Sequence, residues 1–153
     1  CLLSRGLGDV YKRQILAGRR INDSMPTFIV SQIVKQLLKQ NKTSQNAKAL
    51  ILGATFKENC PDLRNSKVVD VYKELSEFGF LVDVFDPEAD AEVFVKEYGF
   101  EKLKEPANKH YDVVILAVSH NSFKSINPKK LLANEGVVFD VKGFYDDPDF
   151  LYL

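Results

Sequence analysis

Cationic side chains gather in the segment that follows the first strongly apolar run of the chain. Gly53 ends the run Lys48–Leu52 (KALIL), and Lys57 and Arg64 come before a helical pattern that starts near residues 65–66 (NS). Glycine lets a ligand approach the backbone closely, and the free N–H groups at a helix N-terminus attract anions. The segment therefore predicts a binding site for a phosphate or diphosphate group.

An alternative role for these cations stays open. Lys57 and Arg64 have acidic neighbours in Glu58 and Asp62, and the two cations are also consistent with ion pairs at the surface. The segment has neither the GxGxxG fingerprint of dinucleotide-binding domains nor the GxxxxGK pattern of a P-loop. The prediction is therefore of anion binding in general and not of a particular cofactor.

Two later apolar runs are also followed by polar residues. Lys142 comes after Val137–Val141 in the segment FDVKGF, and Gly143 permits a tight turn beside it. His120 comes after Val113–Val118 in the segment AVSHNSF. Lys142 is either a ligand-binding cation or a solvated loop lysine. His120 either contacts a base or sugar or has a structural role.

Asp86 and Cys60 each suggest chemistry that their surroundings do not support. Asp86 follows the apolar run Leu81–Phe85, where an acid binds the ribose in many NAD sites, but without the glycine fingerprint a turn with Pro87 is the better interpretation. Cys60 has cationic neighbours that would activate a thiolate, but no histidine lies near it in sequence to act as a base. No catalytic residue is assigned to this chain.

Strand and helix patterns alternate along the chain. Alternation of this kind predicts an α/β fold, a Rossmann-like parallel sheet with helices on both faces. In such sheets ligands bind beyond the carboxyl ends of the strands, where the cations described above fall. The predicted strands are Lys48–Leu52, Leu81–Phe85, Val113–Val118 and Val137–Val141, and the predicted helices run from Val68 to Phe78, Ala89 to Tyr98 and Pro128 to Ala133.

A long helix is predicted before the first strand, within residues 15–40. Apolar residues recur at steps of three and four from Ile21 to Leu38, which places them on one face of a helix of about five turns. Asp23 or Ser24 is the expected cap, with Pro26 in the first turn. The apolar face either packs on the core of its own domain or forms a contact between subunits.

The first residues differ in character from the rest. Residues 1–14 (CLLSRGLGDVYKRQ) lack a regular apolar period and join abruptly to patterned sequence at Ile15, so we interpret them as foreign to the natural protein, which is then longer at its N-terminus. The predicted organisation is a foreign segment at 1–14, a linking helix at 15–40 and a Rossmann-like domain at 47–153.

Composition limits the function further. The 153 residues include 21 Lys plus Arg and 21 Asp plus Glu, and a zero net charge does not suggest a nucleic-acid partner. Apolar runs are too short to span a bilayer, so no membrane partner is expected. Two cysteines are too few for a disulfide framework and favour a cytoplasmic location.

Several motifs, in order, resemble one enzyme family. LGATFKENCPDLRNSKVVDV, VDVFDP, DVVILAVSHNSF and FDVKGF resemble the C-terminal domain of the UDP-glucose/GDP-mannose dehydrogenase family. The preceding AGRRINDSMP and its helix are similar to the helix through which that family dimerises. The resemblance covers Ile15–Tyr145 and is strongest to the branch that oxidises UDP-N-acetylhexosamines for surface polysaccharides.

This resemblance implies a function for the parent protein. It implies an NAD-dependent, two-step oxidation of a UDP-N-acetylhexosamine at C6, with the nucleophilic cysteine and the main NAD site outside this chain, which is then a C-terminal part that binds UDP and is inactive alone. Carried over by motif, Phe56 and Lys57 contact the nucleotide-sugar, Lys142 serves the substrate and Arg64 reaches the NAD side. Many relatives have GR or GRR where this chain has VKG around Lys142. A homodimer through residues 21–38 is also implied.

Two other hypotheses compete with this one. The first alternative is a stand-alone nucleotide-binding or interaction module without catalysis. The native sequence before Ile15 would distinguish this module from a part of a dehydrogenase. An NAD-binding domain in its own right is disfavoured by the missing glycine fingerprint.

Overall fold

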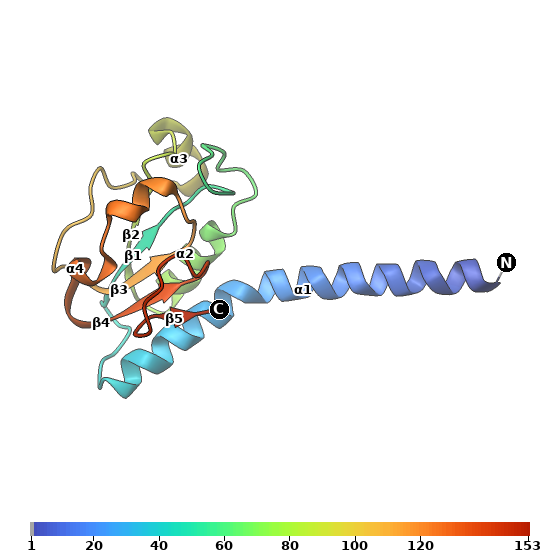
Figure 1. The fold of residues 1–153 in the computed structure, drawn as a ribbon, viewed down its shortest axis with the longest axis horizontal. Coiled ribbons are helices and arrows are strands. Elements are labelled where there is room, and N and C mark those ends of the chain that lie inside the picture. Colours follow the sequence, from blue (N-terminus) through green and yellow to red (C-terminus); the bar gives the residue numbers. More distant parts are fainter. Residues whose placement is uncertain (1) are drawn as a thin grey trace.

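The strands form one parallel sheet in the order β2-β1-β3-β4-β5 (Figure 1). The computed structural model describes the backbone of residues 2–153 and the side chains of residues 9, 10 and 12–153. Because neighbouring strands are parallel, they all end at the same side of the sheet, which we term the carboxyl edge. The strands are β1 (Lys48–Leu52), β2 (Leu81–Phe85), β3 (Tyr111–Leu116), β4 (Leu132–Asp140) and β5 (Leu151–Tyr152).

Helices cover both faces of this sheet. One face is covered by α1 and α2, and the other mainly by short helical turns and the C-terminal segment. The predicted α/β Rossmann-like fold is therefore confirmed. The helices are α1 (Leu2–Lys39), α2 (Val68–Glu77), α3 (Ala91–Tyr98), the 3-10 helix η1 (Asn121–Ser125) and α4 (Pro128–Leu131).

Alternate residues of β1 face opposite cores, which explains why its sequence is apolar throughout. Ala49 and Ile51 pack in the core under α1 and α2, whereas Leu50 and Leu52 pack in the core that contains Phe123. These four of the five β1 residues are fully buried. A parallel strand covered on both faces has no solvent-facing side, so it lacks the polar alternation of an exposed strand.

Helix α1 differs from the prediction in where it begins. We expected a start near Asp23 or Ser24, but the helix is continuous from Leu2, and this prediction is wrong. Ser24 does not cap a helix, since its hydroxyl donates to the carbonyl of Ile21 within the helix, and Asp23 forms an ion pair with Lys67 instead. Cys1 lies outside the described residues. The foreign origin of residues 1–14 stays a prediction.

Pro26 lies inside α1 and not in its first turn. Proline removes one backbone donor and disfavours a straight helix. The part of α1 before this region and the part after it point in different directions (Figure 1). The second part packs on the sheet, and the first part extends away from it.

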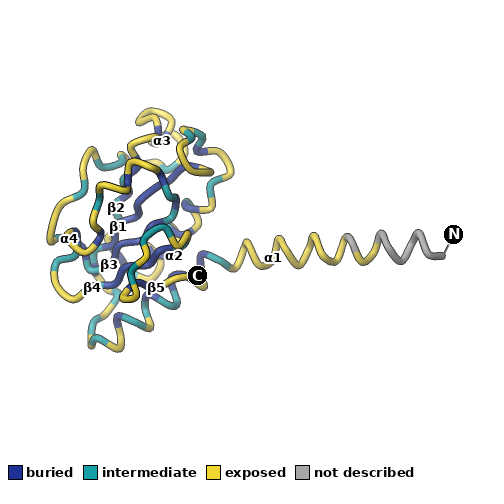
Figure 2. The backbone as a smooth tube through the Cα atoms, viewed as in Figure 1, coloured by how far each residue is buried: buried dark blue, intermediate teal, exposed yellow. Residues whose placement is uncertain are grey.

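The two parts of α1 have different surroundings. Ile29, Ile33 and Leu37 are buried against the domain, which confirms the core-packing role for this part of the apolar face. Residues 12–24, by contrast, are exposed along the extended part (Figure 2). Within the described residues, no helix is both long and apolar enough to cross a membrane.

Strand boundaries agree with the prediction for the first two strands along the chain and less well for the later ones. β1 and β2 have the predicted limits, and β3 begins two residues before the predicted Val113. The helix predicted at Pro128–Ala133 ends at Leu131, because Leu132 already belongs to the longer β4. The short β5 was not predicted, because two residues are too few to show the apolar pattern of a strand.

Gly53 ends β1 with a φ of +88°, a conformation that favours glycine. A Cβ at this position would lie 2.6 Å from the Cβ of Val118 and 2.9 Å from its backbone N. Gly99, which ends α3, has a similar φ of +81°, but a Cβ there would have no neighbour within 4 Å. Substitutions at the two glycines can therefore distinguish the cost of backbone strain, which both positions share, from the cost of steric overlap, which only Gly53 has.

We expect Gly53→Ala to destabilise the domain more than Gly99→Ala. The left-handed conformation alone should cost about 1–2 kcal/mol in both variants. Overlap with Val118 should add about 1–3 kcal/mol in Gly53→Ala only. Urea unfolding measures both differences, and equal losses in the two variants would contradict the close packing described for Gly53.

Candidate functional site

A cavity of about 350 Å³ opens at the carboxyl edge, between α1 and the start of α2. Its floor is apolar, with Ile29 from α1, Val68 and Val71 from α2, and Ile115 from β3. Charged side chains surround this floor. They are Lys57 and Glu58 from the loop after β1, Lys67 from the start of α2 and Lys142 from the loop after β4.

The cavity brings together three of the residues predicted to bind substrate. Phe56 and Lys57 follow β1, and Lys142 follows β4, yet all three line the same space. β3 lies between β1 and β4 in the sheet. The two loops reach the same cavity because the parallel strands end at one edge and the loops are long enough to extend across β3. Phe56 is 59% exposed, which leaves one face of an aromatic ring open to a ligand.

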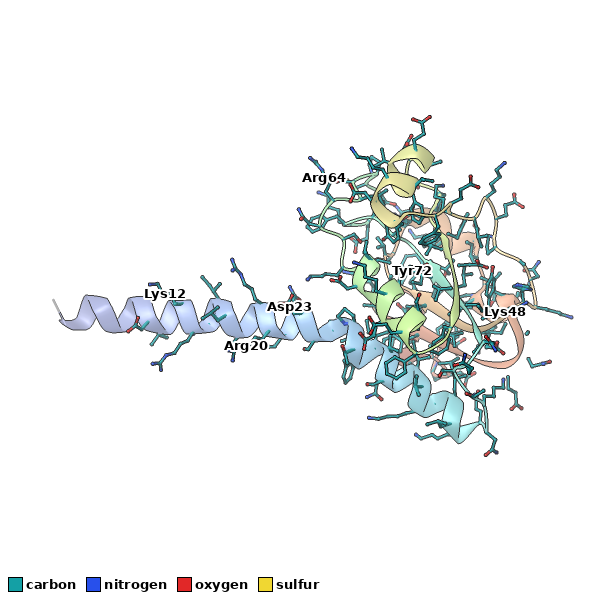
Figure 3. The ribbon with its side chains drawn as sticks, turned by 180° about the vertical axis from the view of Figure 1, so that it is seen from behind. Lys12, Arg20, Asp23, Lys48, Arg64 and Tyr72 are labelled. Atoms are coloured by element: carbon teal, nitrogen blue, oxygen red, sulfur yellow. The ribbon has the colours of Figure 1, made fainter. Side chains whose placement is uncertain are left out.

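Arg64 is not brought into the cavity. Its guanidinium forms two hydrogen bonds of 3.0 Å with the Asp62 carboxylate, and its side chain is 79% exposed. Figure 3 shows it at the outer surface of the domain. The Arg64 side chain is the main reason why the pKa of Asp62 falls to about 2. Arg64 thus forms the surface ion pair with Asp62 that the sequence left open, and its role toward NAD stays a prediction.

Glu58 connects two loops at the cavity, and its ion-pair partner is Lys142 rather than the neighbouring Lys57. Its carboxylate lies 3.9 Å from Nζ of Lys142, and it accepts a hydrogen bond of 3.3 Å from the hydroxyl of Ser119. The pKa of Glu58 is lowered, chiefly by a backbone hydrogen bond and with help from Lys142. Both members of the ion pair are about half exposed, so its contribution to stability is small.

Some residues of the cavity were missed by sequence reasoning. Asn22 and Met25 line it from α1, and Ser66 and Lys67 line it from the start of α2. The Asn65–Ser66 region was noted only as a source of free N–H groups. No sequence signal shows that α1 forms a wall, because the contact joins residues separated by a strand and a long loop.

Asp86 is fully buried and supports a turn, as predicted. Its Oδ1 accepts hydrogen bonds from the backbone N–H groups of Glu88 and Ala89, at 2.8 and 3.1 Å. Its Oδ2 accepts from Ala54 and Thr55, at 2.6 and 3.2 Å. Both oxygens are occupied, so this carboxylate does not offer a site to a ribose.

His120 is also fully buried, and its structural alternative is the one observed. Nε2 lies 3.0 Å from Oδ2 of Asp86, and Nδ1 accepts a hydrogen bond from the backbone N–H of Asn59. Both ring nitrogens are therefore engaged. Cys60, a free and partly buried thiol, gains no base from this imidazole.

Comparison with known proteins identifies the family. Residues 50–147 match the model of the UDP-glucose/GDP-mannose dehydrogenase family, UDP binding domain. The chain belongs to this family. The matched residues include the loop after β1 and the loop after β4, which together line the cavity.

The relatives that contain a similar UDP binding domain are longer than this chain. The UDP-N-acetyl-D-glucosamine 6-dehydrogenase of Pseudomonas aeruginosa is 48% identical over 136 residues, which make up 87% of this chain and 32% of that protein. The enzyme of the same name from Salmonella typhi is 42% identical over 149 residues, 97% of this chain and 32% of that protein. The chain thus spans about a third of the length of these relatives.

Solved structures agree on the fold of the UDP binding domain. The NDP-N-acetyl-D-galactosaminuronic acid dehydrogenase from Methanosarcina mazei matches with a TM-score of 0.78 at 21% identity, over 90% of this chain and 30% of that one. The UDP-D-ManNAc dehydrogenase from Pyrococcus horikoshii matches with a TM-score of 0.71 at 23% identity, over 88% and 31%. At these identities the similarity supports the fold alone.

The buried Asp86 makes the stability of the UDP binding domain depend on pH. Burial opposes its charge, but hydrogen bonds from His120 and from the Ala54 N–H outweigh burial and hold the pKa of Asp86 below its ordinary value of 3.8. A carboxyl group with a lowered folded-state pKa stabilises the protein fully above the unfolded-state value. This contribution is lost as the pH falls through the folded-state pKa.

We therefore expect Asp86→Asn to cost about 1–3 kcal/mol of unfolding free energy at pH 7. The difference from the unsubstituted chain should shrink as the pH falls below about 4. Urea unfolding at a series of pH values measures this difference. Asp146→Asn, which removes an exposed carboxylate, is the control, and a difference for Asp86→Asn that is constant with pH would refute the pKa argument.

Proposed function

We propose that this UDP binding domain holds the UDP group of a nucleotide sugar for an NAD-dependent 6-dehydrogenase. The proposed reaction of the whole protein is oxidation of a UDP-N-acetylhexosamine to its uronic acid. The observation that carries the proposal is the shared cavity of Phe56, Lys57 and Lys142 at the carboxyl edge. The names of the similar relatives support the choice of substrate class.

The composition of the cavity suits a nucleoside diphosphate. Lys57, Lys67 and Lys142 supply positive charge for a diphosphate, and charge-assisted hydrogen bonds to phosphate are stronger than neutral ones. The exposed ring of Phe56 offers an apolar surface against which a base or sugar ring can pack. The apolar floor excludes water from the same space.

The ion pair between Glu58 and Lys142 supports an exchange of partners on binding. At 3.9 Å and half exposed, this contact is weak enough for a phosphate oxygen to replace the carboxylate. Lys142 would then move from Glu58 to the ligand. Binding the remote UDP group in this way would position the sugar C6 for chemistry performed elsewhere in the protein.

The residues of this chain do not themselves fit NAD. The loop after β1 lacks the glycine fingerprint, and the Asp86 carboxylate already accepts backbone hydrogen bonds with both oxygens. We therefore propose that NAD is bound mainly outside this chain. Arg64 is proposed to reach toward the NAD side, because its exposed guanidinium is held only by Asp62 among the ion pairs of the described residues.

The proposed reaction also suggests where the protein works. Nucleotide sugars and NAD are metabolites of the cytoplasm, which supports a cytoplasmic location. The resemblance to the branch that oxidises UDP-N-acetylhexosamines supports a role in surface-polysaccharide synthesis.

Titration calorimetry with UDP tests the nucleotide-binding proposal. The chain should bind UDP and UDP-N-acetylglucosamine saturably, and Lys57→Ala should weaken both by about 10- to 100-fold, since a lost charge-assisted contact has this magnitude. Lys73→Ala is the matched control, because it removes the same charge from an exposed position of α2 outside the cavity. Tight binding of NAD without UDP binding would overturn the proposal.

We also propose that the chain forms a homodimer through residues 21–38 of α1. Ile21 and Phe28 are seven residues apart, so they share one helix face, and they are 62% and 45% exposed. Ile29, Ile33 and Leu37 are used by the domain's own core. The part of the helix that supports a subunit contact is therefore narrower than the sequence pattern alone indicates.

The dimer proposal predicts a change in mass when this face is charged. Analytical ultracentrifugation should give a dimer for the unsubstituted chain and a shift toward monomer for Ile21→Asp. Asn22→Asp adds the same charge about 100° around the helix and should leave the dimer intact. A monomeric unsubstituted chain would contradict the proposal.

A further inference from the structure

Two fully buried ionisable side chains, Asp86 and His120, have no part in the proposed contacts with UDP. Asp86 follows β2 and His120 comes shortly after β3. β1 lies between these two strands in the sheet, so the two residues flank the loop that leaves β1. That loop carries Phe56 and Lys57.

Asp86 binds the first residues of this loop. Its Oδ2 accepts the backbone N–H groups of Ala54 and Thr55, at 2.6 and 3.2 Å. The same oxygen lies 3.0 Å from Nε2 of His120. Oδ1 accepts from Glu88 and Ala89 in the turn after β2, and this fixes the orientation of the carboxylate.

His120 binds the other end of the same loop. Its Nδ1 accepts a hydrogen bond of 2.9 Å from the backbone N–H of Asn59. A nitrogen that accepts a hydrogen bond carries no proton, so the proton of the neutral ring lies on Nε2 and points to Asp86. The Asp86 carboxylate thus selects the tautomer that Asn59 requires.

The loop is therefore held at both ends and braced in the middle. The hydroxyl of Thr55 adds contacts inside the loop: it donates to the carbonyl of Lys57 at 3.1 Å and lies 3.2 Å from Nε2 of His120. These contacts are made on the buried side of the loop. Phe56 and Lys57 project on its exposed side, toward the cavity.

We propose that Asp86 and His120 are positioning residues that hold the loop from Ala54 to Asn59, and with it Lys57, in the geometry that receives a diphosphate. The part that concerns the ligand rests on the proposed UDP binding. A loop that is ordered before the ligand arrives does not lose conformational freedom on binding, so affinity is higher than for a mobile loop. Neither residue touches the ligand.

Two substitutions of His120 separate its two hydrogen bonds. Asn places an acceptor near the position of Nδ1 and removes the donor to Asp86. Gln reaches the position of Nε2, keeps a donor to Asp86 and removes the acceptor for Asn59. A residue that only fills space would make both variants lose function to a similar degree.

The test measures UDP affinity by calorimetry and exchange of the Asn59 amide proton by NMR without ligand. His120→Gln should weaken UDP binding about tenfold and accelerate Asn59 exchange by a similar factor, because the acceptor is lost. His120→Asn should retain most of the affinity and most of the protection. Equal results for the two variants, whether both unchanged or both lowered, would overturn the proposal.

The two measurements also separate this proposal from the proposed function. If the unsubstituted chain does not bind UDP, the proposed function fails. The exchange of Asn59 still decides whether His120 holds the loop. If UDP binds and Asn59 exchange is the same in His120→Gln as in the unsubstituted chain, the positioning role fails while UDP binding stands.

Discussion

A buried carboxylate is tolerated only when hydrogen-bond donors surround it, and at Asp86 this requirement organises the carboxyl edge of the sheet. Its two oxygens accept four backbone N–H groups and face one imidazole nitrogen. The donors come from three chain segments, which follow β1, β2 and β3. Parallel pairing brings these segments to one edge, and the shared carboxylate then holds them in a fixed relation, so the loop that carries Lys57 starts from a rigid base.

Helix α1 contributes to the same edge from outside the sheet. Its packed part covers one face of the sheet through Ile29 and Ile33, and Asn22 and Met25, just before that part, line the cavity. An ion pair of 3.0 Å between Asp23 and Lys67 joins it to the start of α2. The shape of the cavity therefore depends on how this helix packs, and the exposed stretch before it includes part of the face proposed for a homodimer.

Local patterns predicted the first two strands of the chain well. β1 and β2 are short runs of apolar residues bounded by turn residues, and their limits agree with the structure to the residue. The start of α1 was mispredicted because Asp23, Ser24 and Pro26 together have the composition of a helix N-terminus, although here they lie inside a continuous helix. For the candidate site, Phe56, Lys57 and Lys142 were correctly expected at one edge, whereas Arg64 turned outward to Asp62. Which carboxylate a surface arginine selects depends on the turn geometry of the whole loop.

The alternation of strands and helices along the chain, the parallel sheet, the cationic character of its carboxyl edge and the family followed from the sequence, because apolar periodicity and ordered motifs are local properties. Only the tertiary structure decided that Glu58 approaches Lys142, that α1 forms a wall of the cavity, and that His120 and Asp86 are buried partners rather than ligand contacts. Each of these pairs joins residues far apart in the chain. The distances between these residues depend on how the loops leave neighbouring strands and on which side chains the core has room to bury. Local sequence patterns contain no information on these two factors.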